Sequence, residues 1–363
     1  MKLAELVGQL TVAELQPQVF ASGNGGAVVV TPHGARVLGV FTHEGAENLF
    51  YVNSELSSAA TAKKFLEGEH VLGGDRLWIA PERGVFFKGA KLDDGVTTPR
   101  SIDPGEYRIG RLTGDSIRLV NEIHATYYLS LGSTLRAAVE RSIRMAPSPF
   151  ADFPAVLPAL KGVKYAGYEI ASRFELLESP QDGLSFGMWF LIQLAMPVDG
   201  GGGHLYVPTL GRTVIADYYE PTGADYLRVE ENHVRFKLDS KQRHKIGIRK
   251  TEVTGRAAYL SNADAGGKAT LVVRNFLNNP SANYADVPLH TPSGTQDSVQ
   301  SYNHFSGPGG FGELEYHAPG VNRAAAEPVV YDTNQVWCFT GRREDLVAVA
   351  SRLLGLPSST FAL

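Results

Sequence analysis

The sequence predicts an all-β protein, a large sandwich or barrel with one short helix near each end. Short alternating or apolar segments recur at intervals of roughly ten residues, and Gly and Pro separate them. Helical spacing of apolar residues is clear only near the two ends. The chain has 363 residues, 43% of them apolar, which is enough for a large core. Because no composition break marks a linker, we expect residues 1–363 to form one domain.

The first third of the chain predicts one helix followed by strands. Residues 1–18 carry Leu and Val at helical spacing. The runs AVVVTP and ARVLGVF, with His33-Gly34 between them, predict a hairpin, and Gly114-Asp115 is expected to join EYRIGRL to SIRLVNEI. Residues 134–145 are Ala-rich, which favours helix, but their alternation and a possible partner in AGYEIASRFELLE predict a long strand.

The rest of the chain continues the pattern of short predicted strands separated by turns. The Pro-rich SPFADFPAVLPALKG is expected to wrap the surface, and GLSFGMWFLIQLAMP predicts a central strand. DGGGG is read as a flexible turn. HVRFKLD alternates most cleanly, and FGELEYHAPG predicts a late strand. Residues 343–356 show helical spacing and a Gly-Pro stop, which predicts a C-terminal helix.

Composition excludes several classes of function. The net charge of -4, with Lys and Arg scattered, gives no reason to expect nucleic acid or a membrane as partner. One cysteine, Cys338, allows no intrachain disulfide and no cysteine-based metal site. The N-terminus lacks the apolar core of a signal peptide, so we expect a soluble, cytoplasmic protein, or a periplasmic or secreted one if a signal peptide has been removed.

The stretch GGDRLWIAPE, residues 73–82, is the most informative part of the chain. On a strand, Arg76 and Trp78 project from one face, and Leu77 and Ile79 from the other. A guanidinium can donate to sugar hydroxyls, and an indole can stack on the apolar face of a pyranose. The structural alternative is a buried strand in which Arg76 pairs with an acid such as Asp75 or Glu82 and Trp78 fills the core.

The order of these motifs resembles the galactose mutarotase-like superfamily, which includes aldose 1-epimerases and hexose-phosphate mutarotases. The resemblance rests on HGARVLGVFTHEGAENLFYVN, GGDRLWIAPE, HLYVP and ELEYHAPG, in that order. The chain resembles the uncharacterised bacterial branches of this superfamily, which share a GG-x-R-x-W-x-x-P-E strand, more than it resembles true aldose epimerases. Asp75-Arg76 stands where galactose mutarotases carry Asn-Arg. The resemblance implies a β-supersandwich that binds a mono- or oligosaccharide and needs no cofactor.

Mutarotation needs one group to take the proton of the anomeric hydroxyl and another to protonate the ring oxygen. By resemblance, Glu315 is the base and His204 the acid, with Arg76 orienting the sugar and Trp78 stacking on it. His317 lies on the same strand face as Glu315 and is an alternative acid. Further candidates share a polar side chain on a predicted strand or turn. They are Glu82, Asp75, Glu313, His124, Asp217 and Arg274, and Lys245 and His304 are minor candidates.

Each candidate also has a plainer explanation, because alternation places many polar residues on the solvent face of any sandwich. No phosphate-binding loop, Rossmann glycine pattern, nucleophile elbow or zinc motif is present, and no ligand spacing favours a metal. Two other functions stay open. One is a carbohydrate-binding protein without catalysis, and the other is a glycoside hydrolase or lyase that uses carboxylates such as Glu82 and Glu315.

Overall fold

The computed structural model describes residues 1–68, 71–89, 95–130, 133–153, 160–197, 201–288, 296–307 and 309–362. The middle of the predicted Pro-rich connection (154–159) and the start of DGGGG (199–200) lie outside the described residues. Strands dominate, and two antiparallel sheets form the molecule, so the predicted all-β class is confirmed.

The first sheet contains nine of the described strands and carries the residues 73–82 stretch at its centre. In spatial order its strands are β1 (Gln18–Ala21), β2 (Ala27–Thr31), β3 (Arg36–Phe41), β4 (Asp75–Ala80), β9 (Gly187–Ala195), β18 (Phe311–His317), β17 (Asp297–Asn303), β14 (His244–Arg249) and β11 (Ile215–Asp217). Neighbours in this sheet come from distant parts of the chain, as β4, β9 and β18 show.

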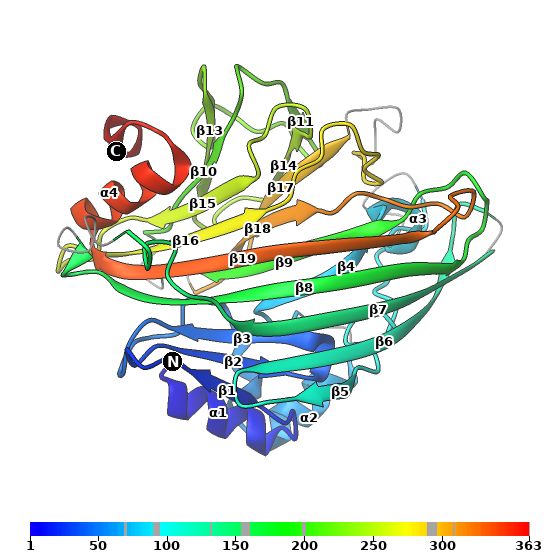
Figure 1. The fold of residues 1–363 in the computed structure, drawn as a ribbon, viewed down its shortest axis with the longest axis horizontal. Helices are drawn as coiled ribbons and strands as arrows, with labels where there is room; N and C mark the ends of the chain where they lie inside the picture. The colour runs from blue at the N-terminus through cyan, green and yellow to red at the C-terminus, as the bar shows by residue number, and fades with distance from the viewer. Residues whose placement is uncertain are drawn as a thin grey trace.

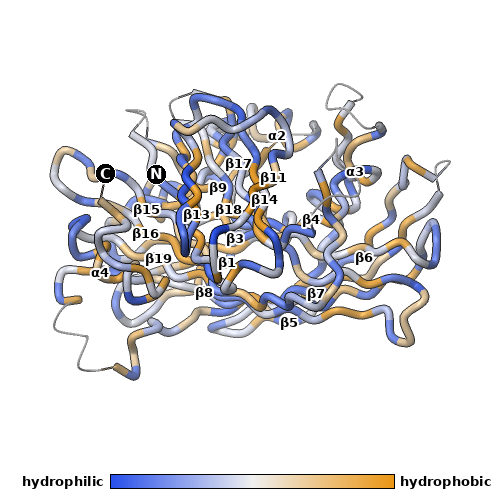
Figure 2. Tube along the Cα trace, turned by 90° about the horizontal axis from the view of Figure 1, so that it is seen from above, coloured by the Kyte–Doolittle hydropathy of each residue, from blue (hydrophilic) through white to orange (hydrophobic). Residues whose placement is uncertain are grey.

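The second sheet contains ten of the described strands, several of them long. Its order is β12 (Leu227–Val229), β13 (His233–Leu238), β10 (Gly203–Pro208), β15 (Arg256–Ser261), β16 (Lys268–Phe276), β19 (Val329–Arg342), β8 (Lys164–Glu178), β7 (Ser133–Met145), β6 (Ser116–Tyr127) and β5 (Arg108–Leu112). Figure 1 shows β19, β8, β7 and β6 crossing the molecule in front. Seen from above in Figure 2, β8, β7 and β5 lie on one side, and β9, β18 and β14 on the other.

The structure confirms most of the expected elements. The segment 134–145 is the strand β7, paired antiparallel with β8, because its alternate residues are buried against the core. A turn at His33–Ala35 joins β2 to β3. In β13, Val234, Phe236 and Leu238 are buried, as their alternation predicts.

The helices differ in part from the prediction. The N-terminal helix α1 (Leu3–Val12) is shorter than residues 1–18, since Glu14 and Gln16 have positive φ angles that end it. The C-terminal helix α4 (Arg343–Leu354) is confirmed and ends at Gly355 in the left-handed conformation. Two helices were not predicted, α2 (Ala59–Glu67) and the single turn α3 (Glu82–Val85). No helix in the described ranges is long and apolar enough to cross a membrane.

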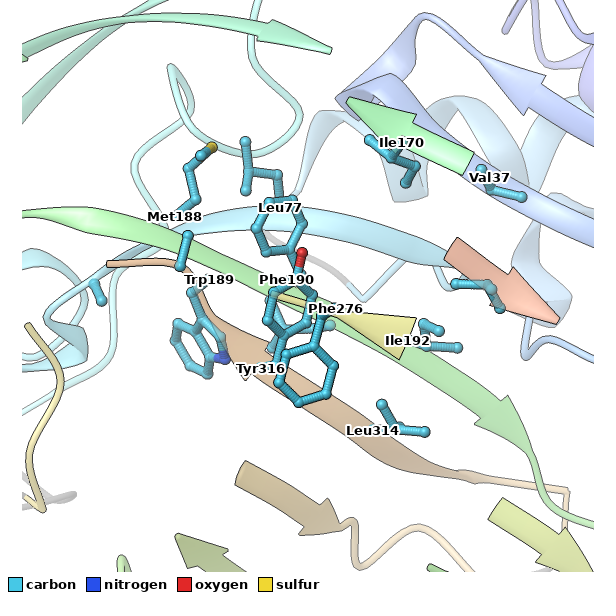
Figure 3. Packing of buried hydrophobic residues seen from close by; sticks show 14 of the residues in the cluster. Val37, Leu77, Ile170, Met188, Trp189, Phe190, Ile192, Phe276, Leu314 and Tyr316 are labelled. Carbon is cyan, nitrogen blue, oxygen red and sulfur yellow. The ribbon is translucent and has the colours of Figure 1, made fainter. Parts of the chain in front are cut away.

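The main core lies between the two sheets. Alternate side chains of β4, β9 and β18 enter it, and Figure 3 shows Phe190, Tyr316 and Phe276 packed side by side there. The ring centroids of Phe190 and Tyr316 are 4.7 Å apart, and those of Phe276 and Tyr316 are 4.5 Å apart. Because side chains alternate along a strand, the residues between these project from the opposite face of the first sheet.

Candidate functional site

Two glycines set the position of β4. Gly73 and Gly74 have φ angles of 113° and 76°, and a Cβ on them would lie 2.1 Å from Tyr51 O and 2.4 Å from Val37 O. Only glycine fits this close approach to neighbouring backbone. The strand that follows directs Leu77 and Ile79 into the core and Arg76 and Trp78 to the outer face, as the sequence predicts.

A cavity of about 270 Å³ lies over the outer face of β4, β9, β18, β17 and β14. Aromatic walls come from Trp78, Phe86, Trp189, Tyr219 and Tyr302. The polar side chains that line it are Arg76, Glu82, Gln193, Lys245, His304 and Glu313, with Arg243 at the rim. A cavity with aromatic walls and converging polar groups is the usual form of a small-molecule site.

Arg76 and Glu313 form an ion pair at the base of this cavity. The Arg76 guanidinium donates to Glu313 Oε1 at 3.0 Å, and both side chains are 5% exposed. Gln193 Nε2 donates to the same oxygen at 2.9 Å. The three residues stand on adjacent strands, β4, β9 and β18. The register places Glu313 opposite Gln193, whereas Arg76 lies opposite Leu191, so its side chain reaches along the sheet to Glu313. Arg76 therefore pairs with Glu313, neither with Asp75 nor with Glu82.

A second cluster of charged side chains is centred on Lys245. Its ammonium donates to Glu82 Oε2 at 2.9 Å, lies 3.9 Å from Glu315 Oε2, and sits 4.2 Å from the ring centroid of Trp189. Burial opposes the charge on Lys245, but the nearby carboxylates Glu82 and Glu315 outweigh it and raise the Lys245 pKa. Burial also raises the pKa of Glu82, against the attraction of Lys245.

Glu315 and His317 lie behind the cavity wall. Trp189 Nε1 donates to Glu315 Oε2 at 2.8 Å, and the ring of His317 stacks on Trp189 at 5.4 Å. Neither residue is part of the cavity lining. Burial, reinforced by Glu313 and Glu82 against Lys245, raises the pKa of Glu315 to about 8. Burial lowers the pKa of His317 to about 4.

Trp78 forms part of the cavity wall, and its ring packs against other side chains of the protein. Phe86 stacks on it at 4.4 Å, and the Arg76 guanidinium carbon lies 4.3 Å from its ring centroid. Its indole N–H donates to Asp103 Oδ2 at 2.8 Å. These contacts fix the orientation of the indole beside the cavity.

The structure places other predicted site residues elsewhere. Asp75 accepts hydrogen bonds from Arg274 at 2.7 Å and Tyr168 at 2.7 Å, and it is buried on the opposite side of β4 from Arg76. Asp75 and Arg274 are therefore part of the interior between the sheets. Both were predicted to contact the substrate, but alternation along their strands directs them to the interior face instead.

Two histidines and one aspartate also lie apart from the cavity. His204, on β10, lies beside Tyr206, which packs on Phe361 near the C-terminus, and burial lowers the His204 pKa to about 4. His124 is exposed on β6, 3.1 Å from Glu122. Asp217, on β11, accepts from the backbone N–H of Thr222. None of the three lines the cavity that contains Arg76 and Glu313.

Several cavity residues were not predicted from the sequence, or were predicted only as minor candidates. Gln193 is the one polar side chain in the otherwise apolar strand GMWFLIQLA. A single polar residue in such a strand is the sequence feature that could have indicated a site residue. Tyr219 and Tyr302 carried no signal that separates them from core aromatics. His304 was a minor candidate, and its ring stacks on Phe311 at 4.3 Å while its Nδ1 has no hydrogen-bond partner among the described residues.

The described residues do not suggest a metal centre. Within those ranges, no group of three or more His, Cys, Asp or Glu side chains is arranged to hold an ion. The chemistry that the arrangement offers is hydrogen bonding and proton transfer by carboxyl groups held in two different charge environments.

Comparison with known proteins gives one family model. A model described as a family of unknown function, DUF6786, matches residues 11–361. No curated protein matches the sequence.

Several solved structures are similar to this chain. A galactose mutarotase-like protein from Lactobacillus casei is 10% identical, covering 90% of this chain and 99% of its own, with a TM-score of 0.43. A GalM/aldose epimerase homologue from C. elegans is also 10% identical, with the same coverage and a TM-score of 0.41. Galactose 1-epimerase from Lactobacillus acidophilus is 9% identical, covering 89% and 93%, with a TM-score of 0.43.

Proposed function

We propose that this chain, which belongs to the DUF6786 family because that model spans residues 11–361, binds a sugar in the cavity of the first sheet and interconverts its anomers. The observation that carries the proposal is the pair of differently held carboxyl groups in one cavity. Glu313 is ion-paired with Arg76, and Glu82 is hydrogen-bonded to Lys245. The motif resemblance to galactose mutarotases supports the choice of a sugar as substrate.

The lining fits a polyhydroxylated ligand. Arg76, Gln193 and His304 offer nitrogen groups, and the two carboxyl groups accept hydrogen bonds from hydroxyls. Tyr219 and Tyr302 face each other edge to plane at 5.7 Å and add apolar surface for the carbon side of a sugar ring. A volume of about 270 Å³ suits one ring more than a chain.

The reaction follows from the two carboxyl groups. Glu313 removes the proton of the anomeric hydroxyl, and Glu82, whose pKa is raised by burial, gives a proton to the ring oxygen. The bond between the anomeric carbon and the ring oxygen breaks, the aldehyde rotates, and the reverse transfers close the ring on the other face. We assign the base to Glu313 in place of Glu315, because Glu313 lines the cavity.

The test combines binding with anomer exchange. Calorimetry with glucose and galactose measures binding, and polarimetry of freshly dissolved α-anomers measures exchange. We expect Glu313→Gln and Glu82→Gln each to reduce exchange about 100-fold or more. Glu122→Gln, an exposed carboxylate on β6, is the matched control and should retain the wild-type rate. Unchanged exchange in both cavity variants would refute the mechanism, and no binding of either sugar would refute the substrate class.

A glycoside hydrolase is the second candidate, favoured by the same two carboxyl groups. Such enzymes place an acid and a base or nucleophile on either side of the glycosidic bond. Glu82 and Glu313 both line the cavity, so both could reach a glycosidic bond held there. Release of nitrophenol from nitrophenyl glycosides, lost in Glu82→Gln, would favour hydrolysis over anomer exchange.

A further inference from the structure

A second, smaller cavity adjoins the proposed sugar site. It has a volume of about 80 Å³, and Val71, Arg76 and Trp78 line both cavities. This volume is too small for a sugar ring and is suited to a substituent of a few atoms. The side cavity is more enclosed than the main one, because α2 closes it with Phe65 and Leu66.

The walls of the side cavity are divided by chemistry. Phe65, Leu66 and Leu72 form an apolar part, and His33, Thr98 and Asp103 form a polar part. A hydroxymethyl group would leave the apolar part unfilled, and an alkyl group would leave the polar part without partners. A substituent with a methyl group, a carbonyl oxygen and an N–H would satisfy both.

The charges around the side cavity are already balanced. Arg36 forms an ion pair with Asp103, and Arg76 forms one with Glu313. An anionic substituent would face the Asp103 carboxylate, and a cationic one would face the Arg76 guanidinium, so a neutral substituent is favoured. Burial lowers the pKa of His33 to about 4, so its imidazole is neutral at pH 7.

Arg76 contributes a buried donor to the lining of both cavities. Arg76 is 4% exposed, and its Nε–H makes no hydrogen bond within the described residues. Arg76 lines both cavities, so an acceptor at their junction would be placed beside this donor. A carbonyl oxygen is the neutral acceptor that this position requires, since leaving the N–H without one costs free energy.

We propose that the side cavity is a specificity pocket for an acetamido group, so that the sugar bound at the main cavity is an N-acetylated amino sugar. The acetyl methyl packs on Phe65 and Leu66, the carbonyl oxygen accepts from Arg76 Nε–H, and the amide N–H donates to Asp103. The inference rests on the proposed function, because it names the substrate class of the same site.

The experiment compares N-acetylglucosamine and N-acetylgalactosamine with glucose and galactose by calorimetry. We expect at least one acetamido sugar to bind tenfold or more tightly than its parent hexose. Leu66→Trp fills only the side cavity and should remove this preference, with the affinity for the parent hexose unchanged within twofold. Leu112→Trp, at an exposed position on β5, is the matched control and should keep the preference.

Saturation-transfer NMR on the wild-type protein gives an independent measurement. The acetyl methyl protons should receive more saturation than the ring protons, because they are the most enclosed. Equal affinity for acetamido and parent sugars, or a preference that survives in Leu66→Trp, would overturn the specificity pocket while leaving the sugar site intact. Failure of every sugar to bind would instead overturn the proposed function, and this inference with it.

Discussion

The guanidinium of Arg76 donates to the carboxylate of Glu313 at 3.0 Å, although the two residues are 237 positions apart in the chain. One comes from β4 and the other from β18, with β9 between them. The pair is buried at the base of the proposed sugar cavity, so it affects both the stability of the sheet and the charge presented to a ligand.

Replacing Arg76 with Met should destabilise the protein. Removal of Arg76 leaves Glu313 as a buried carboxylate with the hydrogen bond from Gln193 but without its charge partner, which costs about 3–5 kcal/mol. Urea unfolding at pH 7 measures the loss. Arg76→Lys, which keeps the charge but lacks the forked geometry, should be intermediate. A loss below about 1 kcal/mol in Arg76→Met would show that the pair is compensated by solvent.

Glu315 should make the protein less stable as pH rises from about 4.5 to 8. Burial raises its pKa in the folded state from 4.5 to about 8, so across this range the folded protein binds more protons than the unfolded chain. The free energy of unfolding then falls with pH, by at most about 1.4 kcal/mol per pH unit. Glu315→Gln removes this contribution.

Urea unfolding of wild type and Glu315→Gln at pH 5.5, 6.5 and 7.5 tests this. The difference between the two proteins should shift in favour of the variant as pH increases. Parallel profiles would contradict the raised pKa.

His317→Phe should be tolerated at pH 7 and favourable in acid. The His317 ring stacks on Trp189, and neither ring nitrogen has a hydrogen-bond partner among the described residues. Burial lowers its pKa from 6.5 to about 4, so the wild type loses stability as pH falls through this window while the unfolded chain takes up the proton.

Thermal unfolding at pH 5 and 7 measures the effect of His317→Phe. We expect a higher Tm than wild type at pH 5 and a difference of only a few degrees at pH 7. A variant that is folded but has lost anomer exchange would instead indicate that His317 is the acid, the alternative to His204 that the sequence offered.

Gly74→Ala should be strongly destabilising. Gly74 has a φ of 76°, and a Cβ would lie 2.4 Å from Val37 O. Strain and displacement of backbone together should cost about 2–4 kcal/mol. Gly114→Ala, in a surface turn where a Cβ meets nothing within 4 Å, is the control and should change stability by about 0.5 kcal/mol or less. Chemical unfolding of both variants measures these losses. Equal stability of Gly74→Ala and Gly114→Ala would contradict the close approach of Gly74 to the Val37 carbonyl.

The sequence by itself determined the class of fold and the faces of single strands. Alternation of apolar and polar residues predicted β7 and β13 correctly, and it placed Arg76 and Trp78 on the face of β4 opposite to Leu77 and Ile79. These features depend on neighbours in the chain, because the period of a strand is a local property. Helix α2 was not predicted, since its 9 residues are fewer than the roughly 11 or more over which helical spacing is recognised in a sequence.

Only the tertiary structure decided which polar residues meet. Asp75 and Arg76 are adjacent in sequence, yet Asp75 joins Arg274 in the interior while Arg76 joins Glu313 at the cavity. Likewise Glu313 lines the cavity and Glu315, on the same strand face, lies behind Trp189. Such partners are set by strand order and by the register between distant strands, and a single sequence contains no local signal for either.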